Sequence, residues 1–219
     1  NSHLEPHAKG QRNRLTPLKK EAARISTNVT QTIKQLTKQT LVYGVGNVLT
    51  RLITFLLLPL FTNVLSPEEY GLTTLLYVFL GFMNVIYHYG LDAAFMRFYS
   101  DARDNAAKDL IFSTSLWLGL VTSTFFSTLI IISASQLSLF LLGGENYDNL
   151  IRLSAVILFF DALSHIPFAL LRLKERSFHF MSIKFLNVVI TLGLNIYLVL
   201  VKGMGLHGVF LSLTIASTF

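Results

Sequence analysis

Long apolar runs with few charges follow one another through most of this chain, and they restrict its fold more than any other feature. A helix that crosses a membrane needs roughly 20 consecutive apolar residues, with a range of about 17–25. Five runs meet this length and a sixth begins near Leu206. The five are residues 41–65, 72–91, 110–134, 150–171 and 178–201. The sequence therefore predicts an all-α fold, a polytopic membrane helix bundle of six transmembrane helices, with the sixth span truncated at residue 219.

The composition agrees with a protein that faces lipid. Charged residues make up 14% of the 219 residues, against about 25% in a typical soluble domain. The chain has no cysteine, which excludes disulfides and cysteine metal sites. We find no HExxH, no G-x-S-x-G and no glycine-rich loop after a strand. A membrane enzyme would need catalytic residues in a large outer loop, and the longest predicted one, residues 135–149, offers only Glu145 and Asp148. We therefore do not expect an enzyme, and we expect no cofactor.

The distribution of positive charge predicts the orientation. Residues 1–40 hold eight of the 18 Lys and Arg residues, and cytoplasmic segments of membrane proteins are enriched in such residues. With the N-terminus inside, the inner segments 1–40, 97–109 and 172–184 carry fifteen of the 18, and the outer segments carry only Arg152 and Lys202. We expect a multi-pass membrane protein with its N-terminus in the cytoplasm.

The chain divides into a basic cytoplasmic segment, residues 1–40, and a six-span lobe, residues 41–219. Apolar residues recur every three or four positions in the basic segment: Leu18, Ala22, Ile25, Val29, Ile33 and Leu36. This spacing predicts an amphipathic helix on the inner membrane surface, with a short coiled coil as the alternative. A basic arm of this kind also suits nucleic acid, but its place ahead of a first span favours a membrane anchor.

A second local motif marks the start of a helix after the first span. The sequence Ser66-Pro67-Glu68-Glu69 places a serine N-cap before a proline at the first helical position. The glutamate three residues after the serine completes a capping box.

Polar residues fall on one helical face of several predicted spans. Asn47 and Arg51 are one turn apart in the first span. The second span carries Asn84, His88 and Asp92, and the fourth carries Ser154, Asp161, His165 and Arg172. Uncharged polar residues in spans commonly serve helix–helix packing. Here the alternative is that they line a cavity, and we take Asn47, Asn84 and His88 as candidate substrate-binding residues.

The charges inside the spans need partners or water. Arg51 lies ten residues after Leu41 and Asp161 eleven after Leu150, so both are near the middle of a hydrocarbon core of about 30 Å. A charge there costs about 2.5–3.5 kcal/mol on a lipid-facing helix. We expect Arg51 to line a cavity and bind an anion, because its planar guanidinium binds phosphate oxygens bidentately. For Asp161, a coupling role and a structural pair remain equally open. His165, one turn away, is a proton relay or a hydrogen-bond partner.

The stretch Tyr87–Asp101 closes the second span with charged and aromatic residues. In the predicted orientation it lies at the cytoplasmic mouth, where Arg97 is placed to meet an anionic head group. Asp101 is one turn from Arg97 and is expected to pair with it, whereas Asp92 is less well aligned. We assign Arg172, by contrast, to topology and contact with anionic lipid.

Three stretches resemble a known family. KQTLVYGVGNVLTRLITFLLLPLFTNVLSPEEYG (38–71), YGLDAAFMRFYSD (89–101) and LLRLKERSFHFMSIKFLNVVITLGLNIYLVL (170–200) look like parts of the bacterial polysaccharide biosynthesis proteins. These are O-antigen-type oligosaccharide flippases of the multidrug/oligosaccharidyl-lipid/polysaccharide exporter superfamily. The resemblance implies a two-lobed bundle of twelve to fourteen helices, of which this chain is the N-terminal half.

The resemblance also implies a function. The family moves lipid-linked oligosaccharides, typically on undecaprenyl diphosphate, across the cytoplasmic membrane by alternating access, and cationic cavity residues such as Arg51 suit that substrate. The implied partners are membrane lipid, the lipid-linked oligosaccharide diphosphate and glycan assembly enzymes, with no nucleic acid. The drug-exporting branch uses acidic sites coupled to protons or sodium, so Asp161, His165 and Asp92 keep a cation-coupled multidrug exporter open as the alternative. A non-transporting scaffold is a further alternative, in which Arg51 and Asp161 are only a structural pair.

Overall fold

The computed structural model describes residues 61–144 and 147–218, together with Gly44, Val48, Phe55 and Pro59. By its internal contacts the chain divides into two units, residues 1–44 and residues 45–219, and the helices from α2 onward belong to the second. The predicted amphipathic helix and most of the first predicted span lie outside the described residues, and so do Asn47 and Arg51.

Every regular element among the described residues is a helix. The elements are α2 (Pro67–His88), α3 (Leu91–Asp101), α4 (Asn105–Ile132), α5 (Ala134–Leu142), α6 (Asp148–Leu173), α7 (Ser177–Asn195), the π-helical segment η2 (Ile196–Val201) and α8 (Gly205–Ser217). Four stretches are long and apolar enough to cross a membrane, namely Pro67–Asp101, α4, α6 and Ser177–Val201, and α8 is a shorter apolar helix. The predicted membrane helix bundle is thus confirmed at this level, whereas six spans and a second lobe remain predictions.

Three predicted spans coincide with helices. Residues 110–134 correspond to α4, 150–171 to α6, and 178–201 to α7 with η2. The capping box is also confirmed: the Glu69 backbone N–H donates to Ser66 Oγ at 3.2 Å, and the Ser66 N–H donates to Glu69 Oε2 at 3.0 Å.

Two predicted segments differ from the structure. The second span was expected to run without a break from 72 to 91, but α2 ends at His88 and α3 begins at Leu91. Between them Tyr89 has φ 29° and Gly90 has φ 80°, and positive φ angles interrupt a right-handed helix. Much of the predicted outer loop 135–149 is helix α5, which follows α4 after the single residue Ser133.

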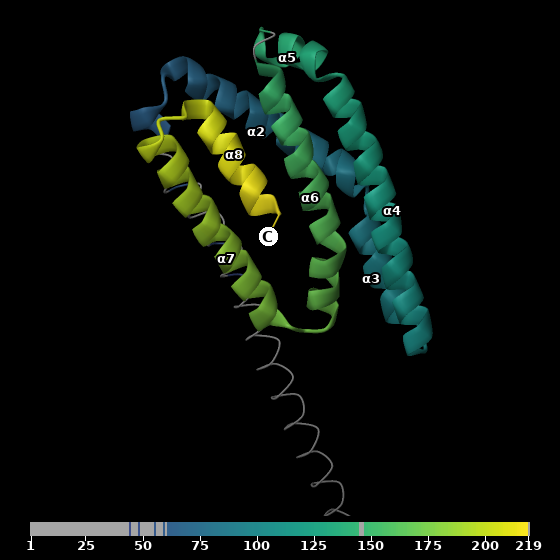
Figure 1. Cartoon of the computed structure of the whole chain (residues 1–219). Coiled ribbons are helices and arrows are strands. Elements are labelled where there is room, and N and C mark those ends of the chain that lie inside the picture. Colours follow the sequence, from purple (N-terminus) through teal and green to yellow (C-terminus); the bar gives the residue numbers. More distant parts are fainter. Residues whose placement is uncertain are drawn as a thin grey trace, which may run out of the picture. The chain divides into compact units, whose positions relative to one another are not determined.

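Helix α6 is the centre of the described unit. It packs against α2, α3, α4, α5, α7 and α8, which are all the other α-helices from α2 onward. In Figure 1, α6 and α7 are joined by a short turn at the lower end, and α8 lies between them at the upper end. Helix α4 runs along the opposite side of α6.

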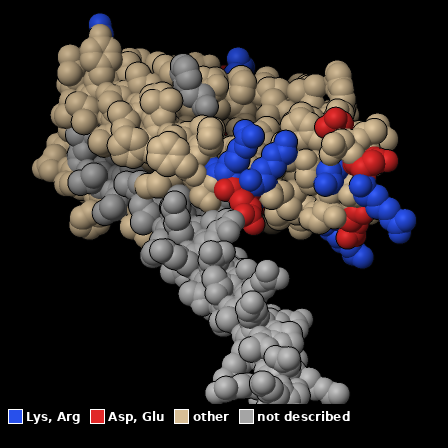
Figure 2. Space-filling view, turned by 90° about the horizontal axis from the view of Figure 1, so that it is seen from below, with Lys and Arg blue, Asp and Glu red and all other residues tan. Residues whose placement is uncertain are grey.

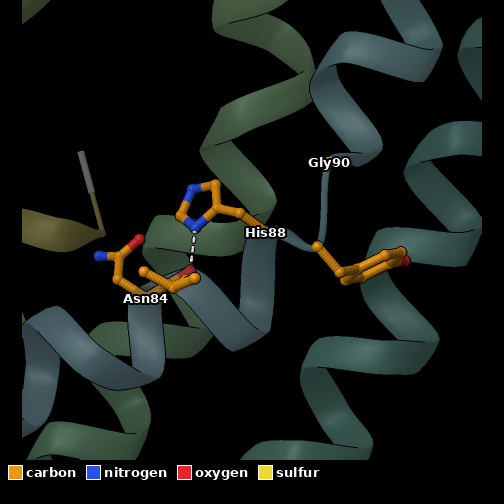
Figure 3. Close-up of a pocket in the computed structure, with 5 residues that line it drawn as sticks. Asn84, His88 and Gly90 are labelled. Atoms are coloured by element: carbon orange, nitrogen blue, oxygen red, sulfur yellow. Dashed lines mark hydrogen bonds between the residues drawn. The ribbon is translucent and has the colours of Figure 1, made fainter.

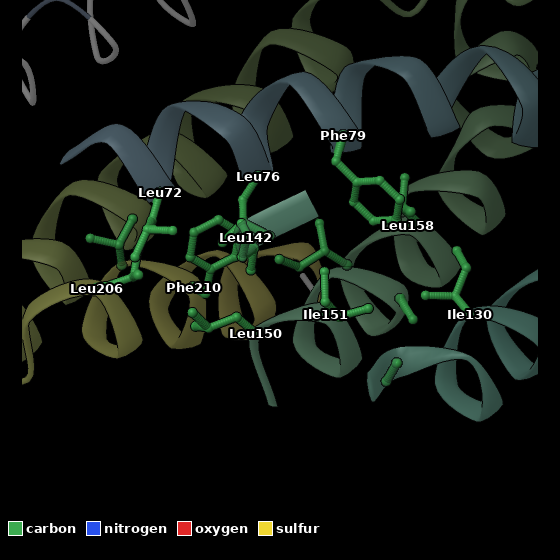
Figure 4. Close-up of a cluster of buried hydrophobic side chains, with 14 of the residues drawn as sticks. Leu72, Leu76, Phe79, Ile130, Leu142, Leu150, Ile151, Leu158, Leu206 and Phe210 are labelled. Carbon is green, nitrogen blue, oxygen red and sulfur yellow. The ribbon is translucent and has the colours of Figure 1, made fainter. Parts of the chain in front are cut away.

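The buried apolar residues form two separate clusters. The larger cluster joins α2, α4, α5, α6 and α8 (Figure 4), and Leu76, Leu150 and Phe210 in it are completely buried. The smaller cluster consists of Phe95 from α3 with Ile166 and Ala169 from α6, surrounded by partly buried residues of α3, α4 and α6. Along α6 the polar residues Asp161, Ser164 and His165 lie between the two clusters.

Buried hydroxyl groups connect three helices inside the larger cluster. The Tyr87 hydroxyl of α2 lies 2.9 Å from Ser127 Oγ of α4, and Ser127 Oγ donates to the Ala155 carbonyl of α6 at 3.1 Å. Since the Ser127 hydrogen is used by the Ala155 carbonyl, the Tyr87 hydroxyl is the donor to Ser127. A similar link joins α7 to α8, where Asn187 Nδ2 donates to the Ala216 carbonyl at 2.7 Å.

The hydroxyl groups of Tyr87 and Ser127 form this series of hydrogen bonds, and removing one or the other is expected to have unequal effects on stability. Ser127→Ala leaves the buried Tyr87 hydroxyl without its acceptor and removes the bond from α4 to α6, so it should lower the free energy of unfolding by about 1–3 kcal/mol. Tyr87→Phe keeps the bond from Ser127 to Ala155 and should cost less, about 0.5–1 kcal/mol. Thermal unfolding in detergent measures both, with Thr124→Ala, whose hydroxyl bonds only within its own helix, as the control. An equal loss of unfolding free energy in the two variants would contradict this series of hydrogen bonds.

Candidate functional site

Charged side chains gather at one end of the described helices. The ends of α3 and α6 and the start of α4 lie together at the lower end of Figure 1, and Figure 2 shows Lys, Arg, Asp and Glu across this face. The segments there are 97–109 and 172–184, which carry 3 and 4 of the Lys and Arg residues. Two segments that charge counting assigned to the same side of a membrane thus lie at the same end.

A set of ionisable residues from four helices extends from this end toward the middle of α6. We call it the polar layer, and it consists of His88 (α2), Asp92 (α3), Asp161, His165 and Arg172 (α6), and Lys184 (α7). All but the more exposed Arg172 are half-buried. The residues lie on α6 and on helices that pack against α6. The polar layer therefore forms only when these helices are packed together.

Two histidine rings make the closest contact in the polar layer. The His88 and His165 rings are edge to face, with their centroids 3.4 Å apart. His88 Nδ1 is hydrogen-bonded to the backbone carbonyl of Asn84 (Figure 3). Because a carbonyl only accepts, Nδ1 carries the hydrogen and Nε2 is an acceptor. Nε2 is buried and has no hydrogen-bond partner among the described residues.

Each acidic residue of the polar layer faces a basic residue from another helix. Arg172 Nη2 of α6 lies 3.8 Å from Asp92 Oδ2 of α3. The electrostatic neighbours of Asp161 are Lys184 of α7 and His88 of α2. Lys184 also places its Nζ 4.6 Å from the centre of the Phe168 ring, a favourable cation–π arrangement. With neutral histidines the polar layer carries no net charge.

An open cavity of about 580 Å³ lies beside the break between α2 and α3. It is lined by Asn84, Val85, His88, Tyr89 and Gly90. Figure 3 shows the Asn84 and His88 side chains on the last turn of α2 and Gly90 after it. The cavity is open, and His88 forms part of its lining.

The structure brings together most of the described residues that the sequence singled out. His88, Asp92, Asp161 and His165 meet in the polar layer, and Asn84 lies one turn before His88. Arg97 does not join them: it is exposed on α3, and it makes no ion pair with any described residue. The expected pair of Arg97 with Asp101 is thus wrong for this structure, and Asp92 pairs with Arg172 instead of supporting Arg97.

Two members of the polar layer were not predicted in this role. Arg172 belongs to the polar face of the fourth span, seven residues after His165, but it was assigned to topology and lipid contact. Lys184 was counted only as an inner charge. The signal for Lys184 was available, because it is the one Lys, Arg, Asp or Glu in the predicted span 178–201, six residues after Phe178. Its partner Asp161 lies on another helix, and no spacing rule connects the two.

Metal binding has no support in the described residues, since no group of three or more His, Asp or Glu side chains there is arranged to hold a metal ion. The polar layer instead contains an ion pair between helices, from Asp92 to Arg172. Such a contact helps to fix the positions of α3 and α6.

Comparison with known proteins gives one match. The family model described as "Polysaccharide biosynthesis protein" matches residues 36–218, which covers α2 to α8 and the residues before them. No curated protein and no solved structure matched the chain.

Proposed function

This chain belongs to the polysaccharide biosynthesis protein family, and from that membership we propose that it is a flippase for a lipid-linked oligosaccharide. The substrate we propose is an oligosaccharide on a polyprenyl diphosphate of the undecaprenyl type, moved from the inner to the outer leaflet of the bacterial cytoplasmic membrane. The match over residues 36–218 carries the proposal, and the four helices long enough to cross a membrane support it.

The proposed mechanism is alternating access between two lobes, of which this chain is the N-terminal one. A diphosphate cannot cross about 30 Å of hydrocarbon without counter-charges and polar groups. Arg51 and Arg97 supply the charges in this proposal, with Asn47, Asn84 and His88 as polar lining. The N-terminus and the charged end of the described helices then face the cytoplasm, where the lipid-linked substrate is made.

A cation-coupled multidrug exporter of the same superfamily is the second candidate. The observation that favours it is Asp161, an acidic residue that the fold keeps half-buried between membrane helices. Lys184 is an electrostatic neighbour of Asp161, and this weakens the alternative, because a carboxylate near a fixed positive charge attracts a cationic drug or coupling ion less strongly.

Transport is tested with the complete protein expressed from its own gene in cells depleted of their own flippase. The amount of lipid-linked oligosaccharide accessible at the outer leaflet is measured at matched membrane levels of each variant. Wild type is expected to restore it, and Arg51→Ala is expected to reduce it about tenfold or more, because a charge-assisted contact contributes about 1.5–3 kcal/mol.

The matched control is Arg152→Ala. Arg152 is an exposed arginine on α6 that pairs with Asp148 one turn away at 3.2 Å, and surface pairs of this kind contribute little. It should transport like wild type. If wild type restores nothing with several glycan types, the flippase proposal fails, and export of cationic drugs with Asp161→Asn becomes the next measurement.

A further inference from the structure

Lys184 brings a positive charge into a membrane helix without a close negative partner. It is half-buried on α7, and among the described residues it forms no salt bridge and no side-chain hydrogen bond. An ammonium group has three N–H donors. A charged residue inside a membrane helix commonly marks the path of a substrate or an ion. The donors of Lys184 are thus available to an anionic ligand.

The ammonium group of Lys184 lies inward of the charged end of the helices. Its Nζ is 4.6 Å from the centre of the Phe168 ring of α6, and Phe168 precedes Leu173, the last residue of that helix, by five positions. Five residues correspond to about 7–8 Å along a helix. A lysine that only marks the inner side of a membrane can instead extend its flexible side chain to the surface. The contact with Phe168 therefore keeps this charge between the helices.

A second cation, Arg172 of α6, is an electrostatic neighbour of Lys184 and repels it. Arg172 is 3.8 Å from Asp92, which is long beside the 2.7–2.9 Å typical of a charged hydrogen bond. Asp161 attracts Lys184 but forms no salt bridge with it. Two cations from different helices thus lie near each other, and neither is closely engaged by a carboxylate. An anion with several oxygens can accept hydrogen bonds from both.

Positive charge is in excess at the connection between α6 and α7. Residues 172–184 hold four Lys and Arg residues against a single acid, Glu175, whereas residues 97–109, at the same end, hold three against three. An uneven distribution of this kind attracts anions to one part of a surface. A negatively charged head group that approaches this end is therefore drawn toward the α6–α7 connection, next to Arg172 and Lys184.

We propose that Lys184, together with Arg172, binds a phosphate group of the lipid-linked substrate. The inference rests on the proposed flippase function, which supplies a substrate with a diphosphate. The planar guanidinium of Arg172 suits two oxygens of one phosphate, and the compact ammonium of Lys184 acts as a point charge with three donors. Lys184 is then a residue that selects a phosphorylated lipid over an uncharged one.

Binding is measured with the complete protein in nanodiscs of phosphatidylcholine, and the probe is farnesyl diphosphate. This compound has a short polyprenyl chain and a diphosphate but no sugar. Its Kd is expected to rise about tenfold or more in Lys184→Gln, because a charge-assisted contact is lost, whereas Lys184→Arg keeps the charge and should retain most of the affinity. The matched control is Lys202→Gln, at an exposed lysine that also lies over an aromatic ring, and it should bind like wild type.

A double variant separates phosphate binding from a structural role. Lys184→Leu/Asp161→Leu removes both charges, and an apolar pair often replaces two opposite charges without loss of stability. If Lys184 serves only to balance Asp161, this variant should bind the probe like wild type. If Lys184 binds phosphate, the variant should be folded and yet have a Kd about tenfold or more above that of wild type.

Phosphatidylglycerol distinguishes a substrate site from general contact with anionic lipid. When it replaces part of the phosphatidylcholine, it offers a phosphodiester with one negative charge, and the Kd of the probe should change little. The proposal is overturned if phosphatidylglycerol displaces the probe as well as unlabelled farnesyl diphosphate does, or if the double variant binds the probe as tightly as wild type.

The same variants are compared in the cellular assay of oligosaccharide exposure. A loss of probe binding in Lys184→Gln, in a protein whose wild type exposes no oligosaccharide, leaves the phosphate site standing and removes the flippase proposal. Full exposure by both the wild type and the double variant does the reverse.

Discussion

Replacing Lys184 with leucine is expected to lower the free energy of unfolding of the described helices by about 2–3 kcal/mol. Lys184 and Asp161 are charged neighbours on different helices, but they do not form a salt bridge with each other. Removal of one partner from a buried ion pair costs about 3–5 kcal/mol, because the other charge is left uncompensated, and the loss here should be smaller. Lys184 and Asp161 are half-buried, so the cost should fall below that range. The fraction of monodisperse protein that remains after heating in detergent gives the loss as a shift in the midpoint temperature.

Two further variants test whether the loss of stability in Lys184→Leu comes from the charge left at Asp161. The double variant Lys184→Leu/Asp161→Leu removes both charges and should recover most of the stability, since an apolar pair of similar volume often replaces an ion pair without loss. Lys202→Leu is the matched control, because Lys202 also lies over an aromatic ring, Tyr197 at 5.9 Å, but is exposed. It should change little. A double variant that is less stable than Lys184→Leu would show that Asp161 does not depend on Lys184.

Gly208→Ala is expected to destabilise the contact between α8 and η2, although alanine normally favours a helix over glycine by about 1 kcal/mol. A β-carbon at Gly208 would lie 3.1 Å from Met204 Cβ and 3.2 Å from the carbonyl carbon and oxygen of Leu198. The Leu198 atoms belong to backbone and cannot move aside as a side chain does. Overpacking of this kind costs about 1–3 kcal/mol.

The matched control for Gly208→Ala is Gly193→Ala. Gly193 lies in α7, and a β-carbon there would have no atom within 4 Å, so only the helix preference should act. The two substitutions should therefore have opposite signs, with Gly193→Ala more stable by about 1 kcal/mol. Thermal unfolding under the same conditions compares them directly. If Gly208→Ala were also stabilising, α8 and η2 would not be packed as closely as the structure shows.

Local features of the sequence predicted local features of the fold well. The capping box at Ser66 and Glu69 needs only four consecutive residues, and both of its hydrogen bonds are present. The spans that became α4 and α6 depend only on the length of an apolar run. The break at Tyr89–Gly90 was missed because apolar residues continue on both sides of it. Gly90, directly after Tyr89, was the one available signal, since glycine readily adopts positive φ.

The candidate site was predictable only in part, for a physical reason. Asp161, His165 and Arg172 share a helix, so periodicity placed them on one face. Which residue each of them meets on another helix depends on packing angles and on the depth at which helices cross. Lys184 and Asp92 enter the polar layer in this way, from α7 and α3. Arg97 was expected to pair with Asp101 from helical spacing alone, but at an exposed site such pairs contribute little.

The central place of α6 has a consequence for how the protein is made. Helices α2, α3, α4 and α5 all precede α6 in the chain, and residues of α6 such as Leu150, Ile151 and Leu158 are buried in the larger cluster. During synthesis the earlier helices therefore enter the membrane before their main partner exists. Until about residue 173 has left the ribosome, the surfaces of these helices that face α6 remain uncovered. A nascent chain stopped before that point therefore exposes these surfaces to the quality-control proteases of the membrane.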